Sequence, residues 1–184
     1  MSFRLRTLLG PRPVLLAAGL AVAGALGAWL PFGRGELPLR ITKFLLPGTR
    51  RGESPSVGEP LRVRLSINRP AFIYVFGVDR ETGAVLRLFP EDPARAALIG
   101  PGRVVLPGAD GELTRGLTDH PGPRALVAGA GPARLEDATL RSIEEEMRRA
   151  AREEDRRDRS WKAARAVLER RFPEAVGFAF DVLP

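Results

Sequence analysis

The 184-residue chain contains no cysteine and a single histidine, His120. The lack of cysteine excludes disulfide bonds, thiolate metal sites, thiol nucleophiles and a lipidated N-terminal cysteine. One histidine leaves little for a histidine-based catalytic triad or a multi-histidine metal site. We therefore expect no metal and no other cofactor, and we expect His120, which lies in a Pro/Gly-rich loop, to be an exposed turn residue.

Lysine is also scarce, because Lys43 and Lys162 are the only lysines among 29 basic residues. The net charge of +7 is unevenly distributed: residues 1–34 carry four arginines and no acid, whereas residues 135–184 carry 11 basic and 12 acidic residues. A nucleic-acid-binding protein concentrates its basic residues on a folded domain, interleaved with stacking aromatic side chains. Over half of the excess here lies in the N-terminal segment, so we expect no nucleic-acid partner.

The longest uncharged run, VLLAAGLAVAGALGAWL, covers residues 14–30 and follows Arg4, Arg6 and Arg12. A run of this length is at the short end of what spans a bilayer as a helix. Basic residues before such a helix hold the N-terminus in the cytoplasm. Residues 1–34 therefore predict a transmembrane signal anchor in the inner (cytoplasmic) membrane that contacts lipid through residues 14–30. The body that follows lies outside the cytoplasm.

A cleaved secretory signal is the alternative to the anchor, and a buried core helix is a third interpretation. Small residues at Ala23-Gly24-Ala25 and Ala25-Leu26-Gly27 have the spacing of a cleavage site. The uncharged run is longer than the apolar region of an ordinary signal peptide, which favours the anchor. Both leading interpretations export the rest of the chain.

Small residues recur every fourth position in the apolar run, at Gly19, Ala23 and Gly27. On a helix they share one face, where a second membrane helix would approach closely. Alanine and glycine dominate the whole segment, so such a row also arises without any role in association.

The first part of the exported body, up to residue 130, is predicted to be formed by β-strands. Residues 35–59 form a linker with a possible edge strand at 37–46, because Pro38 is tolerated only at a sheet edge. Residues 61–68 alternate apolar and polar side chains, the pattern of a half-buried strand. Residues 71–78 are almost continuously apolar and predict a strand buried on both faces, with a hairpin partner at 84–89. Shorter strands are predicted at 103–106, 113–117 and 124–130.

The C-terminal part changes to helical periodicity. Apolar residues spaced three and four apart predict one helix at 135–151 and another at 161–172, and the alternating residues 176–183 predict a final strand. The expected fold is mainly β with C-terminal helices (α+β): an antiparallel Ig-like β-sandwich over residues 60–184. The helices of 135–172 pack on the sandwich, and one N-terminal transmembrane helix precedes it.

The strand pattern resembles a bacterial family, the domain of unknown function 4384, over roughly residues 58–132. The resemblance rests on the alternating strand at 61–68, the strand FIYVFGV that runs into Asp79, the turn at Gly83 and Leu88-Phe89-Pro90. A later Pro-Gly turn before Leu126-Val127-Ala128 also fits. The resemblance implies an accessory β domain that is attached to signalling modules or membrane segments, and it brings no catalytic residues.

The candidate functional residues are few. Arg62 and Arg64 share the exposed face of the alternating strand, where they either meet an acidic partner or lipid headgroups or simply form a solvated polar face. Glu91 and Asp92 are too few for a calcium site, which favours a turn-capping role. Glu144, Glu145 and Glu146 are consecutive on a helix, so they point in different directions and do not converge as an acid/base pair.

The sequence thus predicts a non-catalytic, membrane-anchored extracytoplasmic binding or scaffolding module of a bacterial envelope or signalling system, with an envelope or signalling protein as its partner. A secreted or periplasmic ligand-binding protein is the alternative. A hydrolase that uses the carboxylates of Glu91 and Asp92 is a third and less favoured one.

Overall fold

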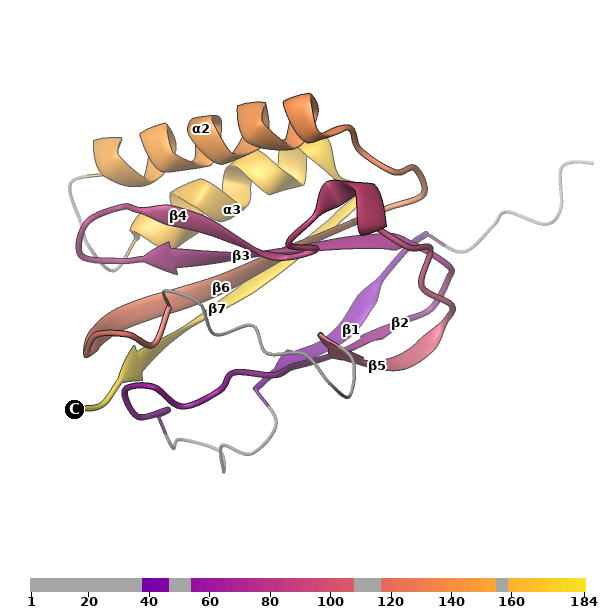
Figure 1. Ribbon diagram of the computed structural model, residues 1–184. Coiled ribbons are helices and arrows are strands. Elements are labelled where there is room, and N and C mark those ends of the chain that lie inside the picture. The colour runs from indigo at the N-terminus through magenta and orange to yellow at the C-terminus, as the bar shows by residue number, and fades with distance from the viewer. Residues whose placement is uncertain (1–37, 47–53, 108–116, 155–158) are drawn as a thin grey trace, which may run out of the picture. The chain divides into compact units, whose positions relative to one another are not determined.

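The computed structural model describes residues 38–46, 54–107, 117–154 and 159–184, and residues 39–184 form one compact unit (Figure 1). The predicted membrane segment 14–30, with Gly19, Ala23 and Gly27, lies outside the described residues, as does most of the strand predicted at 113–117. Within the described ranges, no helix has the length and apolar character needed to cross a membrane.

In the described ranges, seven antiparallel strands form two sheets. The smaller sheet has the order β1-β2-β5, formed by β1 (Ile41–Leu45), β2 (Val63–Ile67) and β5 (Gly102–Leu106). The larger sheet has the order β4-β3-β6-β7, formed by β3 (Phe72–Asp79), β4 (Val85–Phe89), β6 (Gly122–Gly131) and β7 (Glu174–Val182).

The two sheets pack face to face over one hydrophobic core. Val63, Leu65 and Ile67 of β2 point into this core because side chains alternate between the two faces of a strand. They meet Ile73 and Val75, which come from the facing side of β3. Between β1 and β7, which are edge strands of the two sheets, the Phe44 ring packs edge-on against the Phe178 ring, with 5.1 Å between centroids.

A second core lies on the other face of the larger sheet. There Tyr74, Phe76 and Val78 of β3 pack against two helices, α2 (Asp137–Glu153) and α3 (Ser160–Arg171). The described body therefore has three layers: the helices, the four-stranded sheet and the three-stranded sheet (Figure 1). Of the two sheets, only the three-stranded one has a face that no other described layer covers.

The structure confirms a mainly β, α+β fold with antiparallel sheets and two helices. The alternating segment is β2, the apolar segment is the doubly buried β3, and the predicted final strand joins the larger sheet as β7. The first predicted strand lies at a sheet edge, as the proline indicated. One element was not predicted, a short 3-10 turn at Pro93–Arg95.

Candidate binding surface

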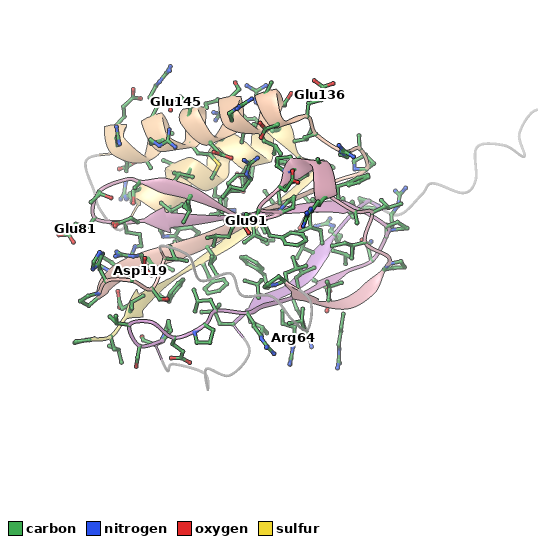
Figure 2. All side chains as sticks on the ribbon, in the orientation of Figure 1. Arg64, Glu81, Glu91, Asp119, Glu136 and Glu145 are labelled. Atoms are coloured by element: carbon green, nitrogen blue, oxygen red, sulfur yellow. The ribbon has the colours of Figure 1, made fainter. Side chains whose placement is uncertain are left out.

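The uncovered face of the three-stranded sheet carries the two arginines that the sequence singled out. Arg62 and Arg64 are both exposed, while Leu61, Val63 and Leu65 between and beside them are buried. Figure 2 shows Arg64 pointing away from the sandwich, on the opposite side of the body from Glu145 of α2. Both arginines are therefore exposed, as the alternation of residues 61–68 predicts.

Strand pairing brings two further cations to the same face. Lys43 of β1 lies opposite Ser66 of β2, and Ser66 lies opposite Arg103 of β5. Lys43 and Arg103 are both exposed. The sequence analysis missed them because they are 23 and 37 residues away from Ser66 in the chain, and only the sheet order β1-β2-β5 makes them neighbours.

We call this surface the basic face and define it by Lys43, Arg62, Arg64 and Arg103, with Leu45 and Val105 between them. Leu45 and Val105 lie on either side of Arg64 in the strand register and are 38% and 39% exposed. β1, β2 and β5 contain no acidic residue. Among the residues that the structure describes, none forms an ion pair with the four cations of the basic face.

The charges of the helical layer are arranged differently, because opposite charges there are paired. Glu145 forms an ion pair with Arg148 one turn further along α2. Glu146 accepts hydrogen bonds from Arg170 and Arg171 at 2.7 and 2.9 Å, and these bonds hold the pKa of Glu146 below its usual value. The consecutive glutamates thus point to different partners, as predicted from helix geometry.

Glu144, the third of these glutamates, turns towards the sheet. The Arg87 guanidinium of β4 reaches α2, with Nε 3.2 Å from Glu144 Oε1 and Nη1 3.2 Å from Asp137 Oδ1. The side chains of Arg87 and Glu144 are both 16% exposed. Burial raises the pKa of the Glu144 carboxyl, and the attraction of Arg87 only partly offsets this effect.

We therefore expect Glu144→Gln to stabilise the fold at pH 7 and to lose this advantage as the pH falls to about 4. The pKa of Glu144 is higher in the folded chain than in the unfolded chain. The protonated carboxyl therefore contributes fully to the free energy of unfolding when the pH is below the pKa of the unfolded chain. This contribution is lost as the pH rises through the pKa of the folded chain. A neutral glutamine has no such dependence. Urea unfolding at both pH values measures the difference.

Glu145→Gln, on the exposed side of the same helix, controls for the loss of one negative charge. If Glu144→Gln instead destabilises the fold at pH 7, the attraction of Arg87 outweighs the burial of the carboxylate.

An ion pair at the end of β3 explains why the strand runs into an aspartate. Asp79 Oδ2 lies 3.3 Å from Nη1 of Arg124, a β6 residue whose side chain is 7% exposed. Asp79 Oδ1 accepts the backbone N–H groups of Glu81 and Thr82 at 2.8 and 3.0 Å. The hairpin then closes through Gly83, which has a φ of 69°. Asp79, Arg124 and Gly83 therefore stabilise the end of β3 and the hairpin that follows it.

Asp92 and the histidine also have structural explanations. Asp92 caps the 3-10 turn by accepting the backbone N–H of Ala94 at 2.9 Å, as the sequence indicated. His120 is exposed, as expected, and its carbonyl accepts a hydrogen bond from Arg124. In the described part of the chain, no three acidic or histidine side chains gather as metal ligands. A shallow hollow on α2 is lined by Ser142, Glu145, Glu146 and Arg149.

The comparisons with known proteins identify the central part of the body. The family model of a domain of unknown function (DUF4384) matches residues 56–132. This segment contains β2, β3, β4, β5 and β6, which include the inner strands of both sheets (β2, β3 and β6), whereas β1, the helices and β7 lie outside it. Neither the search of curated proteins nor the search of solved structures found a match. The resemblance to the domain of unknown function 4384 family is thus confirmed over residues 56–132 of this chain.

Proposed function

We propose that this protein is a non-catalytic, membrane-anchored binding module of a bacterial envelope or signalling system. Residues 14–30 form its transmembrane helix, the N-terminus lies in the cytoplasm, and the body, with an Ig-like sandwich, lies outside. The module binds an anionic partner of the envelope through the basic face.

The observation that supports this proposal is the charge of the three-stranded sheet, whose outer face no other described layer covers and whose cations form no ion pair with a described residue. Arg64 and Arg103 are exposed on a sheet face that carries no acidic residue, whereas the exposed arginines of the helical layer include several paired with glutamates. Exposed charges of one sign attract partners of the opposite sign and accelerate their association. The sheet face is therefore suited to binding, whereas both faces of the larger sheet are covered by other layers.

Photo-crosslinking of the full chain in bacterial cells tests the proposal. A photoreactive residue in place of Val105, which is exposed between the cations, is expected to yield an adduct in the membrane fraction. Arg62→Glu with Arg64→Glu is expected to abolish the adduct, since it reverses two charges of the face. The matched control, Arg141→Glu with Arg149→Glu, reverses two exposed arginines of α2 and is expected to leave the adduct intact.

The intact mass of the purified chain decides between the anchor and a secreted form. A full-length mass supports the anchor, whereas a loss of roughly 25–27 residues identifies signal cleavage and a soluble exported protein. Absence of any adduct from a correctly folded chain contradicts binding through the basic face.

A further inference from the structure

We infer that the anionic partner of the basic face is the phosphate headgroup layer of the membrane itself. This inference rests on the proposed membrane anchoring and specifies the occupant of the same surface. The module would dock flat on the bilayer through its three-stranded sheet and direct the helical layer away from the lipid.

The first argument is the form of the surface. Three of the four cations come from three neighbouring strands, which are about 4.8 Å apart in a sheet, and Arg62 directly precedes the middle strand, β2. Together they line a sheet face. Three of the four are arginines, whose planar guanidinium group binds phosphate oxygens through paired hydrogen bonds. Figure 2 shows the Arg64 side chain extending outward from this face. A flat array of separate phosphate-binding groups matches a headgroup layer better than a single enclosed ligand.

The second argument is the apolar component of the face. Leu45 and Val105 lie on either side of Arg64 and are more than one third exposed. Surfaces that lie in the membrane interface combine basic side chains with aliphatic ones that enter the headgroup boundary. The mixture of aliphatic and basic side chains is therefore the one that an anionic bilayer surface would bind.

The third argument is the length of chain between the predicted membrane helix and this sheet. Ten residues separate Leu30, at the end of the apolar run, from Ile41, the first residue of β1. Fully extended, they reach at most about 36 Å. β1 belongs to the sheet with the basic face, so this sheet follows the membrane helix directly in the chain. Such a short tether gives the lipid a high effective concentration.

The test uses the full chain in nanodiscs, and it benefits from the lack of natural cysteine. Ser66→Cys places one fluorescent label on the basic face, between Lys43 and Arg103. Ser142→Cys places the same label on the exposed side of α2. Nanodiscs of phosphatidylcholine alone are compared with nanodiscs that also contain phosphatidylglycerol, and both carry a lipid with a quencher on its headgroup.

We expect the label at position 66 to be quenched in the phosphatidylglycerol nanodiscs, and the label at position 142 to remain unquenched. Quenching is expected to weaken at high salt and in phosphatidylcholine alone, because screening or removal of the anionic charge weakens docking. Arg62→Glu with Arg64→Glu is expected to lower the docked-to-undocked ratio by at least about fivefold for each lost cation. Arg141→Glu with Arg149→Glu is expected to leave that ratio unchanged.

An unquenched label at position 66 in a chain retained by the nanodisc overturns the inference and leaves the anchor intact. Quenching that resists both salt and charge reversal also overturns it. A Val105 crosslink to an acidic protein, with no lipid adduct, assigns the face to that protein and overturns lipid docking while the proposed function holds. A chain that is cleaved and not retained fails the proposed function itself.

Discussion

Arg124→Met is expected to lower the free energy of unfolding by about 3 kcal/mol. The guanidinium of Arg124 is buried and forms an ion pair with Asp79. It also donates hydrogen bonds to the carbonyls of Leu117, His120 and Pro123, at 3.2, 3.3 and 3.1 Å. Methionine retains much of the apolar stem but removes the guanidinium from the carbonyls of Leu117 and His120, and an unsatisfied buried acceptor carries a full desolvation cost; the Pro123 carbonyl still accepts the backbone N–H of Arg80.

Arg103→Met is the matched control, because it makes the same chemical change at an exposed position of β5. It is expected to change stability by no more than about 0.5 kcal/mol. Urea unfolding of the full chain in detergent, followed by circular dichroism, measures both variants. Equal midpoints for the two variants would contradict the role assigned to Arg124.

A double-mutant cycle with Asp79→Asn separates the ion pair from the carbonyl contacts. The coupling energy between Asp79 and Arg124 is expected to lie between about 0.5 and 3 kcal/mol. The remaining loss in Arg124→Met then reports the hydrogen bonds to the carbonyls of Leu117 and His120, which precede β6, and of Pro123 in β6. Faster proteolysis beside His120 is expected in the same variant, since Arg124 is a contact that holds this segment to the sheet.

The strands could be predicted because their local patterns follow directly from burial. Residues 61–68 alternate since one face of β2 meets the core, and the run at 71–78 is apolar since β3 is covered by a sheet on one side and helices on the other. The final strand was predicted for the same reason: Val176, Phe178 and Phe180 pack against the core between the sheets. Local periodicity therefore identified which residues are buried.

The composition of the basic face could be predicted only in part. Arg62 and Arg64 are neighbours within one strand, so their common face follows from alternation alone. Lys43 joins them because β1 pairs with β2, and Arg103 joins them because β5 returns beside β2 after β3 and β4 have entered the other sheet. Nothing in the local sequence of β5 specifies this crossover. The pairing of Asp79 with Arg124, 45 residues apart, was missed for the same reason.

The helices illustrate the other limit of local patterns. The apolar residues of α2 indicated a helix that packs on the sheet, and the structure confirms it. The charge pattern did not reveal that Glu144 alone among its neighbours reaches a sheet residue, Arg87 of β4. Helix periodicity separates the three glutamates, but their partners depend on tertiary packing.

Phe172→Ala is expected to lower the free energy of unfolding by about 3–5 kcal/mol, as for other buried aromatic residues. Phe172 caps the end of α3 and is 6% exposed. Its ring packs against Tyr74 of β3, with 5.5 Å between ring centroids, and against the backbone of Gly129 in β6. The substitution opens a cavity between the helical layer and the family segment 56–132, and urea unfolding measures its cost.

Gly129→Ala tests the same contact from the other side. A Cβ at this position would lie 2.5 Å from Cδ2 of Phe172, so the variant overpacks the site and is expected to cost about 1–3 kcal/mol. Gly131→Ala is the matched control, because its Cβ would lie 3.4 Å from the same ring, an ordinary contact. Combining Gly129→Ala with Phe172→Leu is expected to cost less than the sum of the two single changes, since the smaller side chain makes room for the methyl group. Strict additivity would show that the ring and the glycine are not in contact, and that another part of the interface attaches the helices to the sheet.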